Sequence, residues 1–469
     1  MKKYYVTTPI YYVNDAPHIG STYTTLAADI IARYYREKLG KDNVFFLTGT
    51  DEHGQKIAES AKKNNQTPIE FADSIVPKFK EAWKLLNINY DYFIRTTDPR
   101  HEKIASDLLQ KLHDKGYIYP GTYEGPYCVG CERYYKESEL LNNRCPLHPD
   151  KDVSYQKERN YFFKLKEVVE NEVLPKIKNS DYKILPEIRK NEVLARIEQG
   201  VEDISISREG VTWGIPLPWD KNQTCYVWVE ALMNYYSATR FLENKEIFWP
   251  ADLHLMAKDI LWFHAVIWEA ILIAAEIELP KTIFAHGFFT RDGQKMSKSL
   301  GNVITPQELV DKYGVDGSRY LLISAVAFGT DGDISLEAFD QKYNADLANG
   351  LGNLVSRVTK LAEKSDFEFE IGNKNHFDKN VAKHIENYRF DEALKLIWQK
   401  ISDLDKKTNE IEPWKLEGKD LRSFLQESIL TIRHIAYNLQ SFMPQTAEKI
   451  LDDFKGPKIK SVEPLFPRI

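Results

Sequence analysis

The 469-residue sequence has few cysteines, no long apolar run and no excess of positive charge. Its four cysteines are too few for a disulfide framework, and three of them fall between residues 128 and 145, which favours a metal site in a reducing compartment. No uninterrupted apolar run reaches the roughly 18 residues that a membrane span needs; the longest candidate, 259–276, contains charged residues and a histidine. We therefore expect neither a disulfide-stabilised secreted domain nor a membrane protein.

The charge balance argues against binding of polyanions through bulk positive charge. Lys and Arg number 63 against 69 Asp and Glu, a formal net charge of −6. The 43% apolar and 28% charged residues are ordinary for a globular protein and exclude a disordered chain. The first 13 residues, MKKYYVTTPIYYV, contain no apolar leader and no Arg- and Ser-rich amphipathic segment, so we expect a cytoplasmic protein.

Two separated stretches have the pattern of strand, helix, strand. Residues 3–13 and 43–47 are predicted strands around a helical pattern at 18–38. A related pattern returns later, with strands predicted at 253–256 and 282–289 around an apolar helix at 260–276. A parallel βαβ unit is the natural interpretation of each stretch. The sequence therefore predicts one α/β sheet whose two halves are separated by an insert.

The C-terminal part has a different character. Apolar residues recur at helical spacing between 394 and 432, and from 375 to 469 glycine occurs only at 418 and 456, so we expect an α-helical bundle. The expected segments are a first half of the sheet, an insert, a second half of the sheet, a connecting region and a helical domain, at 1–115, 116–225, 226–290, 291–345 and 346–469.

Two short motifs accompany the halves of the predicted sheet. His18-Ile19-Gly20-Ser21 lies where the first strand gives way to the first helix, and the free N–H groups of a helix start suit phosphates. Lys295-Met296-Ser297-Lys298-Ser299 follows a glycine turn and forms a positive loop that can clamp a triphosphate. Taken singly, the first motif is equally consistent with a capped helix carrying an incidental histidine, and the second with a solvated loop.

The insert contains two ligand knuckles typical of zinc. Cys128-x-x-Cys131 and Cys145-x-x-His148 are separated by 13 residues and together supply the Cys₃His set that tetrahedral zinc accepts. Four protein ligands leave no open position, so one structural Zn²⁺ per chain is expected. Two free thiols and a surface histidine are the alternative, and Cys225 is expected in the core.

The motifs together resemble the two signatures of class I aminoacyl-tRNA synthetases. Three further stretches, Thr8–Asn14, Thr48–Gly54 and Lys258–His264, are similar to the methionyl branch of that class, and the resemblance runs over essentially the whole chain. It implies a split Rossmann-like catalytic domain with a connective insert and a C-terminal helical domain that reads the anticodon. The insert is too short for the editing domain of the isoleucyl, valyl and leucyl enzymes.

The resemblance implies a two-step reaction. The carboxylate of L-methionine attacks the α-phosphate of ATP, and the methionyl group then passes to the terminal ribose hydroxyl of tRNA(Met). Orientation and charge stabilisation carry the first step, with Mg²⁺ accompanying the ATP. The implied catalytic residues are His18, Ser21, Lys295 and Lys298. The implied ATP-binding residues are His18, Gly20, Ser21, Arg208, Lys295, Ser297 and Lys298.

Eight positions match the methionine pocket of the family. They are Ile10, Tyr12, Asp51, Trp228, Ala231, Tyr235, Ile260 and His264. Asp51 is expected to pair with the ammonium, the aromatic rings with the thioether, and His264 with Tyr12 to discriminate near the sulfur. For any one aromatic residue, ordinary core packing is the alternative. Leu232 falls where many members have proline.

The signature departs from the family pattern at its last position, where a serine, Ser21, replaces the second histidine. A hydroxyl can donate a hydrogen bond to a phosphate, but it cannot carry the charge of an imidazolium. The sequence therefore predicts a modest loss of adenylation for Ser21→Ala and a loss of at least about 100-fold for His18→Ala.

In the helical domain, Asn353, Arg357 and Trp414 match the anticodon contacts of the family. The tryptophan is expected to stack on a base and the other two to bond base edges, whereas a buried Trp and a surface Asn/Arg pair are the alternative. No further tRNA-binding or dimerising module follows, so we expect a monomer. A small nucleotidyltransferase, a non-catalytic RNA-binding relative, and a cysteinyl or leucyl enzyme are the competing functions.

Overall fold

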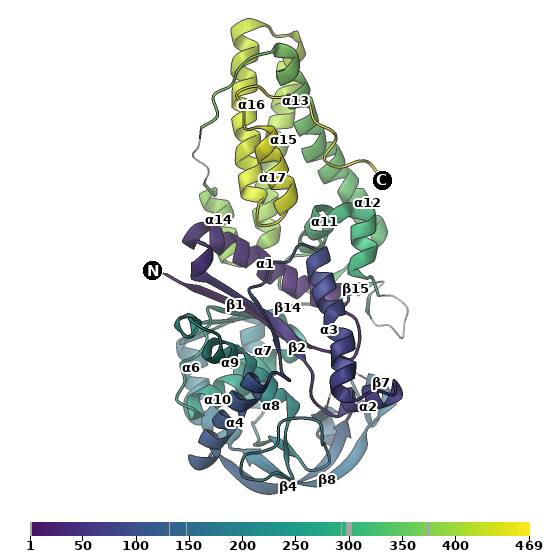
Figure 1. Cartoon of the computed structure of the whole chain (residues 1–469), viewed down its shortest axis with the longest axis vertical. Coiled ribbons are helices and arrows are strands. Elements are labelled where there is room, and N and C mark those ends of the chain that lie inside the picture. Colours follow the sequence, from purple (N-terminus) through teal and green to yellow (C-terminus); the bar gives the residue numbers. More distant parts are fainter. Residues whose placement is uncertain (1, 131, 147, 292, 297–302, 373–375) are drawn as a thin grey trace. The chain divides into compact units, whose positions relative to one another are not determined.

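The computed structural model describes residues 2–130, 132–146, 148–291, 293–296, 303–372 and 376–469. The chain divides into two compact units, both drawn in Figure 1. The first consists of Met1–Pro17, Leu39–Glu81 and Tyr90–His286. The second consists of His18–Lys38, Ala82–Asn89 and Gly287–Ile469.

A six-stranded parallel sheet forms the centre of the first unit. The strand order is β3, β2, β1, β13, β14, β9, with bounds Tyr92–Arg95, Val44–Asp51, Tyr4–Tyr12, Leu253–Ala257, Thr282–His286 and Lys183–Leu185. Every residue of β2 is buried, which is typical of a parallel strand covered on both faces. Val6 of β1 faces Phe46 on one side and Leu253 on the other, so β1 joins the two predicted halves.

The predicted insert forms a second, antiparallel sheet. Its order is β10, β8, β4, β5, with bounds Ile204–Ser205, Ser154–Phe163, Ile118–Cys128 and Arg133–Tyr134. Two short pairs accompany it: β6 (Arg144–Cys145) with β7 (His148–Asp152), and β11 (Ser207–Arg208) with β12 (Thr224–Cys225). The insert also supplies strand β9 to the parallel sheet. A strand of three residues gives no usable alternation in the sequence.

The helices of the first unit belong mostly to the crossovers and the insert. They are α2 (Gln55–Lys63), α3 (Pro68–Leu85), α4 (Pro99–Asp114), α5 (Leu165–Val168), α6 (Leu174–Asn179), α7 (Glu187–Glu198), α8 (Val227–Leu232), α9 (Asn234–Phe241) and α10 (Glu269–Ala274). Short 3₁₀ helices are η1 (Lys41–Asn43), η2 (Glu137–Glu139), η4 (Glu246–Phe248) and η5 (Lys258–Ile260), and short π-helices are η3 (Val169–Val173) and η6 (Phe263–Trp268). The helix predicted at 260–276 is thus a short 3₁₀ turn, a π-helix and α10 in succession.

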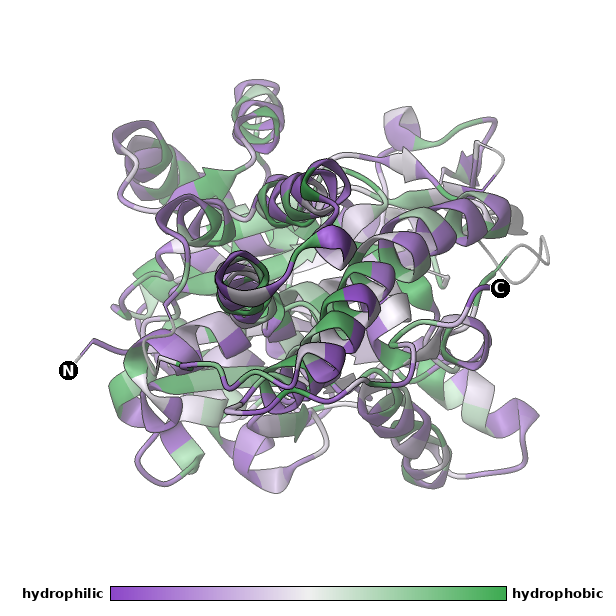
Figure 2. Cartoon of the chain, turned by 90° about the horizontal axis from the view of Figure 1, so that it is seen from above, coloured by the Kyte–Doolittle hydropathy of each residue, from purple (hydrophilic) through white to green (hydrophobic). Residues whose placement is uncertain are grey.

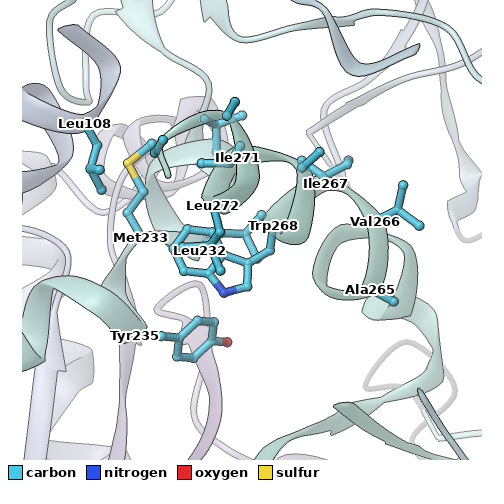
Figure 3. Packing of buried hydrophobic residues seen from close by; sticks show 14 of the residues in the cluster. Leu108, Leu232, Met233, Tyr235, Ala265, Val266, Ile267, Trp268, Ile271 and Leu272 are labelled. Carbon is cyan, nitrogen blue, oxygen red and sulfur yellow. The ribbon is translucent and has the colours of Figure 1, made fainter. Parts of the chain in front are cut away.

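The hydrophobic core of this unit packs the segment after β13 against α8. Figure 3 shows Leu232, Trp268 and Leu272 within this core, and all three are buried. Ile10, Tyr12 and Trp228 pack against the same core while remaining partly accessible. These three predicted methionine-binding residues are therefore packed against the hydrophobic core on one side.

The second unit contains helices and one small sheet. Its helices are α1 (Ile19–Leu39), α11 (Pro306–Ser324), α12 (Leu336–Lys342), η8 (Tyr343–Gly352), α13 (Asn353–Ser365), α14 (Lys379–Glu386), α15 (Phe390–Ile411), η9 (Pro413–Lys415), α16 (Gly418–Leu439) and α17 (Pro444–Asp453). Its strands are β15 (Phe289–Arg291), β16 (Gln294–Lys295) and β17 (Gly332–Asp333).

The long helices of this unit are amphipathic. Ile397, Ile401 and Leu404 are buried on one face of α15, at the spacing that predicted the helix. In Figure 2 single helices carry both hydrophilic and hydrophobic stretches, and Figure 1 shows α13, α15, α16 and α17 side by side. The predicted fold class, a parallel Rossmann-like core followed by a helical domain, is confirmed. Among the described residues, no helix is both long and apolar enough to cross a membrane.

Candidate active site and metal centre

The first predicted motif lies at the start of α1. The N–H of Gly20 donates to Nδ1 of His18 at 3.0 Å, and a side chain at position 20 would come within 2.7 Å of the same ring. Because Nδ1 accepts, the neutral imidazole carries its proton on Nε2. The Ser21 hydroxyl donates to the carbonyl of His18 at 2.9 Å. The backbone N–H of Gly20 thus holds the His18 ring in place and leaves its Nε2 atom as a donor.

The second motif is connected to the first through the backbone. The N–H of Ile19 donates to the carbonyl of Ile304 at 3.3 Å, so the chain just after the lysine loop lies against the start of α1. The loop begins in the β15–β16 hairpin, in which Thr290 pairs with Lys295. Met296 is buried. Residues 297–302, which include Ser297 and Lys298, lie outside the described residues, as does the side chain of Lys295.

Several of the predicted methionine residues lie close to one another among aromatic rings. Tyr12 and Asp51 are neighbours in the β1–β2 register. The Tyr12 ring meets Trp228 edge-on with centroids 6.0 Å apart, and Trp228 stacks on Phe263 at 4.4 Å. Ala231 is buried on α8, three residues after Trp228. The cluster offers the aromatic edges and faces to which a thioether binds well.

A hydrogen-bonded chain joins three further residues that were predicted to bind methionine. His264 lies 3.0 Å by Nδ1 from the carbonyl of Ile260 and 2.8 Å by Nε2 from the hydroxyl of Tyr235. A carbonyl only accepts, so Nδ1 carries the proton and Nε2 accepts from Tyr235. Burial lowers the pKa of His264 to about 4, so the ring is neutral at pH 7. It therefore presents a fixed dipole without a charge.

Asp51 is buried at the end of β2, with 3% of its surface exposed. Its Oδ1 atom has no hydrogen-bond partner within the described part of the chain. Burial raises the pKa of Asp51 well above its usual value, Glu230 raises it further, and His53 opposes the shift. An unpaired buried carboxylate oxygen is costly, and an arriving cationic donor would satisfy it.

A buried charge network beside Asp51 was not predicted. Glu230 bonds Nδ1 of His53 at 2.9 Å and Nε2 of His101 at 3.1 Å. Burial disfavours the charged ring of His53, but Glu230 and Glu102 outweigh it and raise its pKa to about 10. His53 lies in the stretch Thr48–Gly54 and Glu230 directly precedes Ala231, but nothing in the sequence indicates that the two side chains meet.

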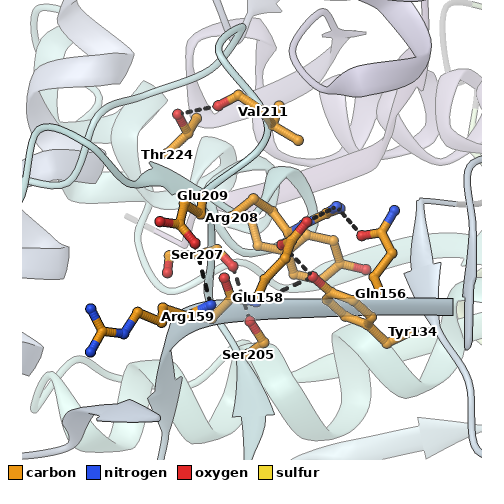
Figure 4. Close-up of polar contacts among 12 residues, drawn as sticks. Tyr134, Gln156, Glu158, Arg159, Ser205, Ser207, Arg208, Glu209, Val211 and Thr224 are labelled. Carbon is orange, nitrogen blue, oxygen red and sulfur yellow. Dashed lines mark hydrogen bonds and ion pairs between the residues drawn. The ribbon is translucent and has the colours of Figure 1, made fainter. Parts of the chain in front are cut away.

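Arg208 is buried within the insert, where Figure 4 shows its contacts. Its guanidinium donates to Glu158 at 2.9 and 3.1 Å and to Gln156 at 2.8 Å. It also lies over the ring of Tyr127 at 4.1 Å. The side chain that was predicted to bind ATP is thus held by partners from β8.

Three of the four predicted metal ligands converge. Cys128, Cys145 and His148 place their ligand atoms within 4.8 Å of one another, and each thiol lies 3.8 Å from Nδ1 of His148. A tetrahedral zinc ion needs a sulfur-to-nitrogen separation of roughly 3.6 Å, so these residues fit such an ion. Cys131 lies outside the described residues. The cluster can hold a metal ion, and its soft donor set favours zinc over magnesium or calcium.

The predicted anticodon residues lie on α13 and η9. Asn353 and Arg357 are one helical turn apart, and Asn353 is exposed. Arg357 donates to Asp405 at 2.7 Å and to Asn409 at 2.8 Å, and its guanidinium lies 5.8 Å from the centroid of Trp414. Trp414 is 52% exposed, so its ring is accessible to a ligand and is not a core residue.

Known proteins place this arrangement in a class. The family model described as tRNA synthetases class I (M) matches residues 4–154 and 130–359. The two signature motifs and the parallel sheet are therefore those of a class I tRNA synthetase, an aminoacyl-tRNA ligase.

Individual relatives show to which family within this class the chain belongs. The chain is 43% identical to the methionine–tRNA ligase of Thermotoga maritima, over 96% of this chain and 74% of that protein. It is 41% identical to that of Fusobacterium nucleatum, over 100% and 80%. A solved structure of Mycobacterium tuberculosis methionyl-tRNA synthetase with methionyl-adenylate superposes over 100% of both chains, with a TM-score of 0.93 and 36% identity. The chain belongs to the methionine–tRNA ligase family.

Proposed function

We propose that the chain joins L-methionine to tRNA(Met) through methionyl-adenylate. A methionine carboxylate oxygen attacks the α-phosphorus of ATP and pyrophosphate leaves; the terminal ribose hydroxyl then attacks the methionyl carbonyl and AMP leaves. The observation that carries this proposal is Asp51, whose buried Oδ1 atom lacks a hydrogen-bond partner within the described residues. The α-ammonium of an amino acid would satisfy that oxygen and favour its ionised form.

Methionine specificity follows from the rest of the pocket. In this proposal Tyr12, Trp228 and Tyr235 contact the thioether, while Ile10, Ala231 and Ile260 complete the apolar wall. The neutral His264 ring, held by Tyr235, supplies a dipole near the sulfur.

The triphosphate is assigned to the start of α1 and to the lysine loop. His18 donates from Nε2, Gly20 and Ser21 line the helix start, and Lys295, Ser297 and Lys298 close from the loop. The bond between Ile19 and Ile304 supports this assignment because it fastens the end of the loop segment to that helix start. Mg²⁺ accompanies the ATP phosphates.

Arg208 is proposed to bind ATP because its position matches an ATP-binding position of the family. Its guanidinium is bonded to Glu158 and Gln156, so it reaches a nucleotide only by exchanging these contacts.

We assign one structural zinc ion to Cys128, Cys131, Cys145 and His148. The convergence of three of these ligands supports the assignment, and the ion supplies folding energy to the insert. Metal analysis of protein purified without chelator is expected to give about one zinc per chain. A value below half a zinc per chain would contradict the assignment.

The helical domain is proposed to read the anticodon. Asn353 and Arg357 would bond base edges while the exposed Trp414 ring stacks on a base. Residues 1–115 and 226–290 serve as catalytic halves, 116–225 as insert, 291–345 as loop and stem contact, and 346–469 as anticodon reader. We further propose that the protein acts in the cytoplasm, because thiol ligands need a reducing compartment. We also propose that it is a monomer, and sedimentation at the mass of two chains would contradict this.

The decisive test is methionine-dependent exchange of pyrophosphate with ATP in the absence of tRNA. We expect exchange with methionine and none with leucine or cysteine. Asp51→Asn is expected to raise the KM for methionine by at least about 10-fold, because the amide cannot pair with the ammonium as an ion. Tight binding of tRNA without exchange would instead favour a non-catalytic relative.

A further inference from the structure

The loop that carries the first zinc knuckle also reaches the methionine pocket. Glu132 directly follows Cys131, is 2% exposed and has a positive φ of 46°. The hydroxyl of Tyr12 donates to Glu132 Oε2 at 2.9 Å. The N–H of Lys56, at the start of α2, donates to the other oxygen of the same carboxylate. One buried side chain thus connects the metal loop with a pocket residue.

The residues around Glu132 hold its backbone and leave room for its carboxylate. The hydroxyl of Tyr226 donates to its carbonyl at 2.5 Å, and Lys56 Nζ donates to the carbonyl of Gly130 at 2.9 Å. Gly54 has a φ of +103°, and a side chain there would come within 2.3 Å of the Glu132 carboxylate. A glycine is therefore required at position 54 for the carboxylate to occupy its place.

Glycine also shapes the metal side of the loop. A side chain at Gly130 would come within 2.8 Å of the His148 ring. The same short segment therefore packs against a metal ligand at Gly130 and holds Tyr12 through Glu132. The ring of Tyr12 in turn meets Trp228 edge-on.

We propose that Glu132 is a positioning residue that sets the orientation of Tyr12 and so couples the folded metal loop to methionine binding. The proposal rests on the assignment of Tyr12 to the methionine pocket. Without the carboxylate, the phenol of Tyr12 loses its acceptor and the ring loses its fixed place against Trp228. Hydrogen bonds to a buried carboxylate are among the stronger ones, so their loss is felt at the pocket.

The test measures methionine binding by calorimetry in the absence of ATP, together with the KM for methionine and for ATP in pyrophosphate exchange. We expect Glu132→Ala to raise the methionine Kd by about 10- to 100-fold and to leave the KM for ATP within about twofold. Glu132→Gln, which keeps the shape and one acceptor for Tyr12, is expected to recover part of that loss. Glu124→Gln, an exposed glutamate on β4, is the matched control and should leave both values unchanged.

A double-mutant cycle on Glu132 and Tyr12 distinguishes an effect of Glu132 through Tyr12 from general damage to the fold. If Glu132 acts through Tyr12, the double variant Tyr12→Phe/Glu132→Ala should lose clearly less affinity than the sum of the single losses. Additive losses, or an equal rise in the KM for ATP, would overturn the proposal. So would a zinc content in Glu132→Gln below half that of the wild type, since the residue would then serve only the metal loop. Failure of the wild type itself to bind methionine would refute the pocket assignment instead.

Discussion

At the scale of single residues, His18 and Ser21 play unequal parts although they share one motif. The backbone N–H of Gly20 occupies Nδ1 of His18 and directs a donor from Nε2. Ser21 donates its hydroxyl to the carbonyl of His18, which is a local role at a helix start. The serine that replaces the family's second histidine is thus held in the helix by its own hydroxyl.

His18→Ala is therefore expected to lower the rate of adenylation by at least about 100-fold, the scale for the loss of one charge-stabilising donor. Ser21→Ala is expected to lower it by less than about 10-fold, since a hydroxyl bond is worth about 1 kcal/mol. Pyrophosphate exchange at saturating substrates measures both. Larger losses for Ser21→Ala than for His18→Ala would refute the assigned roles.

The buried His264 makes stability depend on pH. Burial lowers its pKa to about 4, whereas an unfolded histidine titrates near 6.5. Between these values the unfolded chain binds a proton that the native chain does not, so the free energy of unfolding falls as the pH drops from about 6.5 to about 4, by up to about 1.4 kcal/mol per pH unit. His264→Gln should flatten this acid limb in urea unfolding; an unchanged slope would contradict it.

The sequence could predict those site residues that lie in continuous motifs, such as His18 and Asp51. It could not predict that His53, His101 and Glu230 meet, because their contact spans up to 177 residues of chain. Nor could it predict the acceptor for the N–H of Ile19, a backbone carbonyl at Ile304 that no side-chain pattern encodes. Contacts made by tertiary packing leave no local periodicity.

At the scale of secondary-structure elements, the short helix η9 explains why Trp414 faces solvent. α15 ends at Ile411, and Glu412 takes a left-handed conformation with φ 50° that turns the chain away. Pro413 then starts η9, with its φ already suited to a helix start. The turn leaves the Trp414 ring beside Arg357 and accessible.

Trp414→Ala is expected to lower aminoacylation at limiting tRNA by about 10-fold or more, because a stacked base contributes about 1–3 kcal/mol. Pyrophosphate exchange without tRNA should not change, since that reaction needs no anticodon. Trp414→Phe keeps a stacking face and should retain most of the activity. Equal aminoacylation by the alanine variant and the wild type would exclude the anticodon role.

Long periodic elements were predictable and short ones were not. The strand at 3–13 and the helix at 18–38 are found as β1 and α1, each within one residue of the expected start. No helix was predicted within the insert, yet it contains α5 to α7. α5 and α6 have four and six residues, too few for a periodic pattern to emerge.

At the scale of the whole molecule, the net charge of −6 constrains how RNA can be bound. No bulk cationic field is available, so recognition must depend on local basic groups, stacking and base-edge contacts. Within the second unit, Arg357 beside Trp414 is the local group that we propose for this role.

Another arginine holds distant segments of that unit together. Arg319 on α11 is fully buried; it pairs with Asp29 of α1 at 2.8 Å and donates to the carbonyl of Phe442, just after α16, at 2.8 Å. A buried charge that loses its partner is costly, often about 3–5 kcal/mol.

We therefore expect Arg319→Leu to lower the free energy of unfolding of this unit by about 3–5 kcal/mol. Lys312 lies on α11, like Arg319, and makes an exposed ion pair with Asp340 of α12. Lys312→Ala should therefore lower the free energy of unfolding by less than about 1 kcal/mol. Urea unfolding of the full chain compares them. An Arg319→Leu variant as stable as Lys312→Ala would show that the buried pair contributes little.

The position of β1 in the sheet has a consequence during synthesis on the ribosome. Thr7 of β1 pairs with His254 of β13, which is made 247 residues later, whereas the other edge of β1 is filled early by β2. At about 5–20 residues per second, the nascent chain holds an apolar strand with one edge open for about 12–50 s. Slow translation between residues 51 and 253 would prolong that exposure, and slow translation after residue 286 would not.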